Sequence, residues 1–281
     1  MKYIITILGF ITYNLFYPFR KKKMQVLSLY FHNPAPSSFE KVVRWCLRKG
    51  YEFVEINDIS DYVSGRKTNR KMVHISFDDG WATNIDLLPI VEKYKVPITI
   101  FVPVEPLQNG AYWWQYVYSV YKSDNYVEEY KSYPEEKFRS EIVKIKEKVK
   151  LERSAVTFEQ LGVLNNHPLV DIQSHSYTHP ILNNLSDQSL ERELSESQAF
   201  LCNLLNKDIN VFSYPNGSFS SREVNAVKRY YNSAYTTEEA YPVQGGDMHM
   251  IPRICLLDNY WSNLSRIVGA WQVIKRIKIK K

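Results

Sequence analysis

Short apolar runs alternate with helix-type repeats along most of the chain. Two six-residue runs, VLSLYF at 26–31 and MVHISF at 72–77, are typical of buried strands. Shorter or less regular runs predict further strands at 96–104, 170–173, 209–214, 233–237 and 250–257. Between them, apolar residues recur every three or four positions and predict helices at 37–50, near 85–91, at about 187–206, and after residue 220. This alternation predicts a parallel α/β sheet or barrel.

Local signals mark where these helices begin and where the rhythm breaks. Ser37 to Glu40 and Ser220 to Glu223 each have the spacing of a capping box, and Gly50 is a helix stop. Residues 105–165 interrupt the alternation with a cluster of aromatic residues and a charged helix expected near 135–150. We therefore expect a single domain over 24–258, with 105–165 inserted over one end of it.

The N-terminal segment, residues 1–23, is apolar and basic. Its apolar run, 3–19, is interrupted by Asn14 and is short of the roughly 20 residues that cross a bilayer. It also reads poorly as a signal peptide, because it lacks a small-residue cleavage site and Arg20 to Lys23 follow the run instead of preceding it. That basic cluster predicts a body on the cytoplasmic side of the membrane.

The C-terminal segment, residues 259–281, also combines apolar and basic residues. Apolar residues recur there at helical spacing with lysines and arginines between them: Trp261, Leu264, Ile267, Val268, Trp271, Ile274 and Ile277. A basic amphipathic helix of this kind suits an anionic membrane surface, although the same stripe could simply pack on the body. Our hypothesis is that both ends bind the cytoplasmic face of a membrane, peripherally or through a single N-terminal anchor; an exported protein is the alternative.

The distribution of charge and the number of cysteines argue against two classes, nucleic-acid-binding proteins and disulfide-rich proteins. Of the 281 residues, 44% are apolar, which is enough for a sizeable core. The net charge of +6 resides on the two tails, since residues 24–261 hold 25 basic and 30 acidic side chains, a balance of −5. A nucleic-acid-binding body would carry the positive charge itself, so we expect no nucleic-acid partner. Three scattered cysteines, Cys46, Cys202 and Cys255, do not form a disulfide framework.

Two adjacent carboxylates follow the strand at 72–77, in Asp78-Asp79-Gly80. Neighbouring negative charges raise each other's pKa unless a cation or hydrogen-bond donors compensate. Alternation at the end of a strand points the two side chains in different directions, so one could bind a metal while the other faces a substrate. Taken alone, a solvated Asp-Asp-Gly turn would be the better explanation.

A pair of histidines leaves the strand at 170–173. His175 and His179 are four residues apart and would face the same way on a helical turn. Two imidazoles and one carboxylate make an open three-ligand site for zinc or a similar divalent ion. The coincidence of this pair with the aspartate pair, each just past a strand, favours such a site.

These residues resemble the polysaccharide deacetylases with a NodB-homology domain, carbohydrate esterase family 4. Ser76 to Gly80 match the family's first motif, and His175, Ser176 and His179 match its second. A variant of its third motif is seen at 212–217, FSYPNG. The resemblance covers about residues 25–257 and implies a distorted (β/α)7-type barrel.

The resemblance also implies roles for individual residues. Asp79, His175 and His179 would bind one divalent metal, most often zinc in this family, with cobalt or nickel also possible. Asp78 would be the general base for the water that attacks an acetamide carbonyl. The backbone N–H of Asn216 would stabilise the oxyanion, and acetate and a free amino sugar would leave.

The chain departs from the family pattern at the general acid. The usual late Leu-x-His motif is missing, because residues 255–258 read CLLD. His32, at the end of the first strand, is the candidate in its place, as in members that look circularly permuted. His249 is a second candidate, and an ordinary loop histidine is the alternative for His32.

The third motif also lacks its arginine, since Ser213 or a neighbour stands there. Arg253 resembles an arginine found late in the permuted members and could orient Asp78; a barrel-end salt bridge is the alternative. The candidate substrate-binding residues are Tyr214, Pro215, Trp113 and Trp114, although aromatic clusters such as these, together with Trp81, are often core.

The sequence thus favours a metal-dependent deacetylase that acts on an N-acetylated glycan, in a surface polysaccharide or its lipid-linked precursor. A catalytically impaired relative that binds glycan or scaffolds a membrane assembly is the alternative. A third interpretation is an intracellular amidohydrolase acting on a small non-sugar amide.

Overall fold

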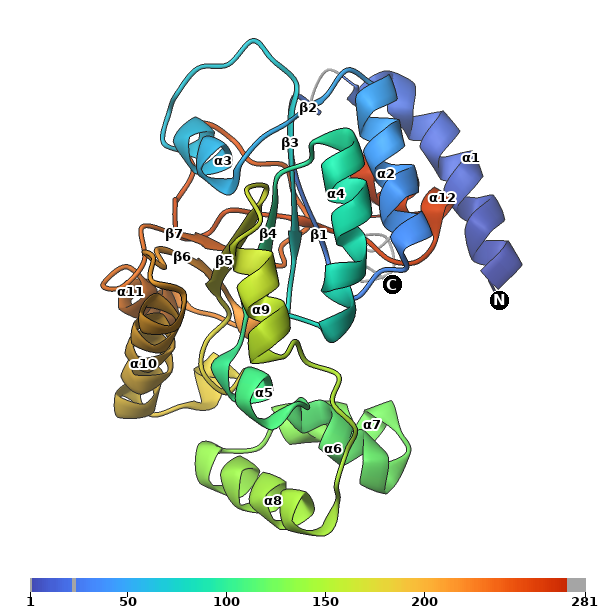
Figure 1. Cartoon of the computed structure of the whole chain (residues 1–281). Coiled ribbons are helices and arrows are strands. Elements are labelled where there is room, and N and C mark those ends of the chain that lie inside the picture. The colour runs from blue at the N-terminus through green and yellow to red at the C-terminus, as the bar shows by residue number, and fades with distance from the viewer. Residues whose placement is uncertain (1, 22–23, 272–281) are drawn as a thin grey trace.

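A computed structural model describes residues 2–21 and 24–271, and Figure 1 shows their arrangement. A single parallel sheet forms the centre, with strands in the order β7-β6-β5-β4-β3-β1-β8 and β2 paired to β3 beside this path. The strands are β1 (Val26–Phe31), β2 (Glu52–Phe53), β3 (Met72–Phe77), β4 (Ile98–Val102), β5 (Val170–Ser174), β6 (Val211–Ser213), β7 (Ser233–Tyr235) and β8 (Ile254–Cys255).

The sheet curls until its two edges approach one another. β1 and β3 pair along their whole length, from Val26↔Met72 to Phe31↔Phe77. At the far edge, Ile251 forms a bridge with Tyr235 of β7, and β8, three residues later, pairs with β1. The chain around 251–255 therefore spans the gap between the edges. The predicted distorted (β/α)7-type barrel is confirmed.

Helices cover the outside of the barrel because each sends an apolar stripe onto the sheet. They are α2 (Pro36–Arg48), α4 (Leu88–Tyr94), α9 (Phe158–Asn165), α10 (Asp187–Leu205) and α11 (Ser221–Val227), and the main core lies beneath them. A second apolar cluster contains inward-facing strand residues such as Val26 and Met72 together with Ile56 and Ile59 of α3 (Ile56–Val63). α3 therefore closes the end of the barrel at which the strands begin.

The residues between β4 and β5 form five helices. They are α5 (Val104–Asn109), α6 (Trp113–Tyr121), α7 (Asp124–Lys131), α8 (Glu135–Lys148) and α9. α6 to α8 have an apolar cluster of their own, which includes Trp113, Val117 and Ile145. Figure 1 shows these three helices beyond the end of the barrel opposite α3.

Several expected boundaries differ from those observed. α2 begins at Pro36 after Ala35, with no side-chain cap, so the capping box expected at Ser37 to Glu40 is wrong. Proline suits this position because its ring presets the helical φ and its missing N–H has no partner in the first turn anyway. The capping box from Ser220 to Glu223 is confirmed. A 3-10 helix, η1 (Ala82–Leu87), leads into α4.

The two ends of the described chain pack against each other. α1 (Lys2–Arg20) lies along α12 (Tyr260–Ile267), and both lie beside α2 (Figure 1). Leu264, Ile267 and Val268 are buried, so this part of the C-terminal stripe packs on the body; Ile274 and Ile277 lie outside the described residues. Among the residues described, no helix combines the length and apolarity needed to cross a membrane.

Candidate active site

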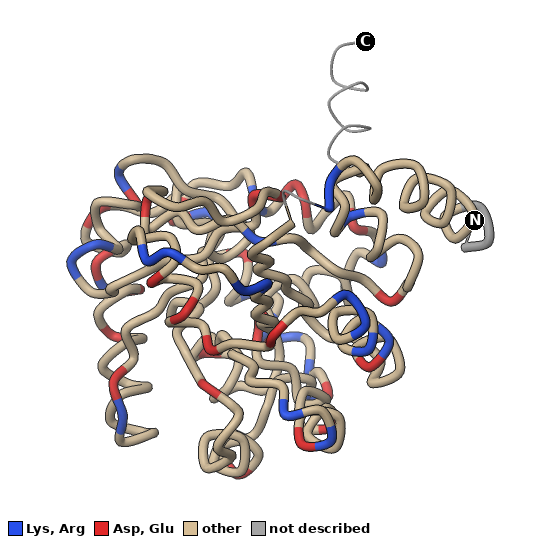
Figure 2. The backbone as a smooth tube through the Cα atoms, turned by 90° about the horizontal axis from the view of Figure 1, so that it is seen from above, with Lys and Arg blue, Asp and Glu red and all other residues tan. Residues whose placement is uncertain are grey.

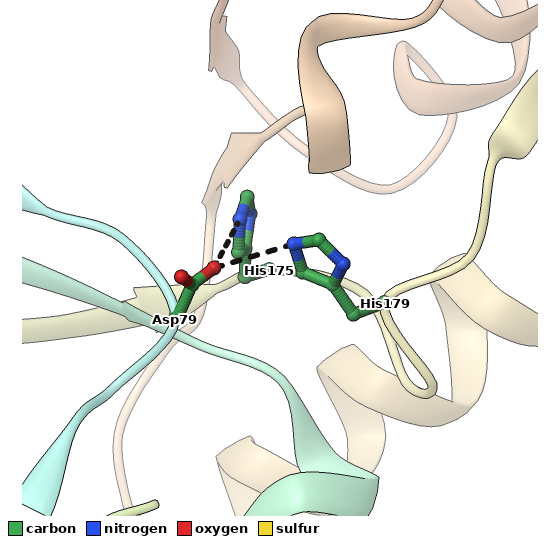
Figure 3. A group of neighbouring side chains, drawn as sticks. All are labelled: Asp79, His175 and His179. Carbon is green, nitrogen blue, oxygen red and sulfur yellow. Dashed lines mark ion pairs between the residues drawn. The ribbon is translucent and has the colours of Figure 1, made fainter. Parts of the chain in front are cut away.

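Asp79, His175 and His179 converge on one point (Figure 3). The Oδ1 atom of Asp79 lies 3.5 Å from Nε2 of His175 and 3.3 Å from Nε2 of His179. Asp79 follows β3 and His175 follows β5, at the carboxyl ends of both strands. All three side chains are buried. The two distant strand ends thus bring together the carboxylate and the imidazole pair that the sequence pointed to.

The two histidines are not brought together by a helical turn, and that expectation is wrong. The chain after β5 is irregular, and Ser176 and His179 have φ of +68° and +58°, in the left-handed region. The Ser176 hydroxyl accepts a hydrogen bond from the N–H of His179, at 3.2 Å. Two left-handed residues therefore fold the loop back so that both rings face Asp79.

Glu193 of α10 holds this loop from outside, and sequence reasoning missed it. Its carboxylate accepts the N–H groups of Tyr177 and Thr178 at 2.9 and 2.8 Å, and the Thr178 hydroxyl at 2.7 Å. Burial raises the pKa of Glu193, against the lowering effect of these hydrogen bonds. The available signal was a carboxylate on the apolar stripe of α10, beside Leu190 and Leu194.

The three side chains fit a divalent metal ion. Nδ1 of His175 lies 2.7 Å from the carbonyl oxygen of Ser213, to which it donates, which fixes the ring with Nε2 toward Asp79. Each of the three side chains can offer one ligand atom, and these atoms all lie within 4.8 Å of one another. Two imidazoles and one carboxylate are a common donor set for zinc with one position left open.

Asp78 makes a separate, fully buried ion pair. Its two carboxylate oxygens accept hydrogen bonds from Nη1 and Nη2 of Arg253 at 2.7 and 2.8 Å. Burial by itself would raise the pKa of Asp78, but the charge and hydrogen bonds of Arg253 outweigh this effect and lower it. The side chain is therefore an ionised carboxylate next to the metal-type site.

Arg253 is held by several segments of the barrel in addition to Asp78. It donates to the hydroxyls of Ser213 and Ser76 at 2.7 and 3.0 Å, and its Nε donates to the carbonyl oxygen of Thr236 at 3.1 Å. Its guanidinium also lies 4.2 Å from the centre of the Tyr30 ring. Ser213, which occupies the place of the third-motif arginine, thus binds the arginine that comes from the late part of the chain.

One cavity of about 590 Å³ lies next to Asp78 and the metal-type ligands. Asp78, Asp79 and both histidines border it, as do His32 and Asn216, two further candidates from the sequence. Asn216 has a left-handed backbone, with φ of +55°. His32 is exposed, and its ring packs edge-on against that of Tyr30.

Three candidates do not border this cavity. His249, Pro215 and Arg253 are not among the described residues that line it, and Arg253 lies buried behind Asp78. His249 lies with its Nε2 2.8 Å from the carbonyl oxygen of Tyr231, and its own carbonyl accepts the hydroxyl of Tyr214. The structure therefore leaves His32 as the candidate acid at the cavity. Tyr214 borders the cavity, with its hydroxyl engaged elsewhere.

Aromatic residues hold the segments that carry the metal-type ligands. The indole N–H of Trp81 donates to Oδ2 of Asp79 at 3.1 Å, and the Tyr112 hydroxyl donates to the Asp79 carbonyl at 3.1 Å. Trp113 donates to the carbonyl of His179 at 2.9 Å, and the ring of Trp114 packs edge-on against His179. The insertion thus supports the site, and Trp81, Trp113 and Trp114 all border the cavity.

The contact with Trp81 engages one of the two oxygens of the Asp79 carboxylate. Oδ2 is engaged by the indole, which leaves Oδ1 to face the two histidines. We expect Trp81→Phe, which keeps a ring but removes the N–H, to weaken zinc binding by about 10-fold or more, as losses of outer-sphere partners do. Competition between the metal-free protein and a chromophoric chelator measures this affinity.

Trp45→Phe is the matched control, because that indole donates to the Tyr13 hydroxyl, at 3.2 Å, away from the cavity. It should bind zinc like the unaltered chain. Equal zinc affinity in the Trp81 and Trp45 variants would show that the indole N–H does not hold Asp79.

Comparisons with known proteins show which family the chain belongs to. Residues 65–234 match the family model described as polysaccharide deacetylase. The curated relative YxkH of Bacillus subtilis (strain 168), named as a candidate polysaccharide deacetylase, is 23% identical over 219 residues, which are 77% of this chain and 63% of YxkH. The chain thus belongs to the polysaccharide deacetylase family.

Solved structures with a similar fold include one that is named as a deacetylase. Streptococcus pyogenes deacetylase PplD, in complex with acetate, superposes with a TM-score of 0.64 at 18% identity, covering 87% of this chain and 97% of PplD. IcaB from Ammonifex degensii gives a TM-score of 0.64 at 17% identity, again covering 87% and 97%. At these identities the likeness establishes the shared fold. The circular permutation stays a prediction.

Proposed function

We propose that this chain is a metal-dependent deacetylase that hydrolyses the N-acetyl group of an amino sugar. One observation carries the proposal: two neighbouring carboxylates have separate partners at one cavity, Asp78 with Arg253 and Asp79 with two histidines. Separation of this kind assigns one carboxylate to the metal and the other to proton transfer. We propose zinc as the ion, with cobalt or nickel able to replace it.

The side chains around the cavity can be given roles in amide hydrolysis. A divalent ion held by Asp79, His175 and His179 would act as a Lewis acid toward the amide carbonyl. Asp78, kept ionised by Arg253, takes a proton from the water that attacks the carbonyl carbon. The C–N bond then breaks as the amine accepts a proton, which we assign to His32, and acetate leaves.

Two further features of the cavity support this reaction. Asn216 borders it in a left-handed conformation, and we assign its backbone N–H to the developing oxyanion. Trp81, Trp113, Trp114 and Tyr214 give the cavity an aromatic wall of the kind that packs on sugar rings.

We propose an N-acetylated glycan as the substrate, in a surface polysaccharide or in its lipid-linked precursor. Support for the lipid-linked form comes from the basic residues at the cavity, Lys131 and Arg266. Arg266 belongs to α12, where it also pairs with Glu239 at 2.6 Å, and α12 packs on α1. The wall of the cavity is thus continuous with the terminal helices, which we expect at a membrane. We expect them on its cytoplasmic side, because Arg20 and Lys21 follow the apolar part of α1.

Metal analysis and acetate release test the proposal together. We expect about one zinc per chain and zinc-dependent release of acetate from an N-acetylglucosamine oligomer. Asp79→Ala and His175→Ala should each lose the metal and reduce acetate release by about 10³-fold or more, because each removes one of three ligands. His167→Ala is the control, since His167 pairs with Glu92 away from the cavity, and it should keep both properties.

The alternative functions predict other results. A protein that binds one zinc and the oligomer but releases no acetate would fit the glycan-binding or scaffold interpretation. A protein that hydrolyses only small non-sugar amides would fit the amidohydrolase interpretation. Either result would overturn the proposed carbohydrate deacetylase activity.

A further inference from the structure

Small and polar residues of helix α1 make its closest contacts with α12. The Thr12 hydroxyl lies 2.7 Å from the hydroxyl of Ser265, and Asn259 donates to the Thr6 hydroxyl at 2.9 Å. Between these contacts, a Cβ atom added to Gly9 would lie 2.6 Å from the backbone of Trp261, closer than a real Cβ approaches. Only glycine allows the two backbones to come this close.

The opposite face of the same helix is apolar and exposed. We define the outer face of α1 as Ile7, Leu8, Ile11, Leu15 and Phe19, whose exposed fractions run from 53% to 80%. A surface helix of a protein in water has the reverse arrangement, with its apolar stripe on the core. Close approach through small residues, hydroxyl contacts between helices and outward aliphatic side chains are instead how helices pack in lipid.

The polar atoms and charges of α1 agree with this environment. The amide of Asn14, exposed near the outer face, donates to the carbonyl of Phe10 in its own helix at 2.8 Å. Residues 1–23 contain no acid, and Arg20 and Lys21 follow the apolar part. In Figure 2 the middle of α1 carries neither red nor blue, because its charged residues are Lys2 and Arg20 at its two ends. An apolar face next to basic residues complements an anionic lipid surface.

α1 is also firmly attached to the catalytic body. The Trp45 indole of α2 donates to the hydroxyl of Tyr13, which is buried, and Phe10 packs edge-on against Trp261, at 4.7 Å between ring centres. A helix of 19 residues is about 28 Å long. It can therefore lie along a membrane surface while remaining packed on α12 and α2.

We propose that the outer face of α1 lies in the boundary between headgroups and acyl chains of an anionic bilayer. The pair α1–α12 then holds the barrel at that surface as one rigid unit. This inference rests on the packing of the two helices and is independent of the chemistry proposed for the cavity.

Vesicle flotation of the full-length, zinc-loaded protein tests the proposal. The protein should float with vesicles of phosphatidylcholine and phosphatidylglycerol at 3:1, a ratio of about 25% anionic lipid, and bind pure phosphatidylcholine more weakly. The double variant Ile11→Gln/Leu15→Gln should lower the partition coefficient by about 10-fold or more, because two apolar side chains no longer favour insertion. Both positions are exposed, so the fold should persist.

Val143→Gln/Leu204→Gln is the matched control, with side chains of 54% and 41% exposure on α8 and α10. It should partition like the unaltered chain. Acetate release from a soluble oligomer should be unchanged in both double variants, which separates this proposal from the one on catalysis.

Three results would overturn the membrane proposal. The first is a protein that does not float with anionic vesicles, and the second is equal partitioning of the two double variants. The third is a protein that does not bind vesicles and forms a dimer in analytical ultracentrifugation without lipid. In that case only the Ile11→Gln/Leu15→Gln variant would be a monomer. That result would assign the outer face of α1 to a second copy of the chain.

Discussion

Asp78→Asn is expected to reduce acetate release by about 10²- to 10⁴-fold, the usual contribution of a positioned general base. Asparagine keeps the shape of the side chain but accepts no proton at neutral pH. Asp79 and the two histidines are unaltered, so metal content should remain at the level of the unaltered chain. Parallel assays of acetate and of metal by atomic absorption measure the two effects.

Asp171→Asn provides the matched control for this substitution. Asp171 lies on β5, pairs with Lys207 at 2.6 Å, and is not among the described residues that border the cavity. It should retain its activity. A thermal unfolding curve is needed for the Asp78 variant, because asparagine leaves the buried Arg253 without its counter-charge. Asp78→Asn protein that is folded and keeps more than about a tenth of the activity would exclude Asp78 as the base.

The fold was largely predictable because parallel strands buried on both faces read as continuous apolar runs. β1 and β3 have the bounds that their apolar runs predict. β2, with two residues, and α3 were not predicted, since so short a strand has no periodicity of its own. β4, β6 and β8 are shorter than expected because pairing with neighbours, not hydrophobicity alone, sets where a strand ends.

The residues of the candidate site were also found in the sequence, but not how the chain positions them. Ser176 and His179 have left-handed conformations, and their loop is held by the carboxylate of Glu193, an arrangement that depends on how the loop packs against α10. The hydrogen bond from the Trp81 indole N–H to Asp79 is local, between residues two apart, but it too depends on the turn that the folded backbone makes there. A sequence pattern gives the type of ligand, whereas the partners that orient it depend on the folded chain.

The faces of α1 illustrate the same limit. The sequence shows an apolar segment and a basic cluster, and both a membrane contact and packing on the body remain compatible with them. The structure adds that Thr6, Gly9 and Thr12 face α12 while the outer face of α1 is exposed. The position of α12 shows which face of α1 is buried and which is exposed. Sequence alone does not give this position, because Thr12 and Ser265 are more than 250 residues apart.

Arg253→Met is expected to lower the free energy of unfolding by about 3–5 kcal/mol, the usual loss when one member of a buried ion pair is removed. Methionine fills part of the space but leaves the buried Asp78 carboxylate without its two N–H donors. The hydroxyls of Ser213 and Ser76 lose their partner as well. Urea unfolding monitored by circular dichroism measures the effect. Acetate release should fall too, since Asp78 is no longer held ionised in place.

Two further variants separate the charge of Arg253 from its geometry. Arg253→Lys retains the charge but cannot donate two parallel hydrogen bonds to Asp78, so its stability should lie between those of the unaltered chain and Arg253→Met. Arg222→Met removes an arginine that is 39% exposed and pairs with the exposed Asp187 and the buried Glu223, and it should cost less than Arg253→Met. If Arg253→Met and Arg222→Met were equally stable, the buried pair would not be what joins the strands around Asp78. A loss confined to Arg253, with metal content retained, would instead show that this arginine supports the base without taking part in metal binding.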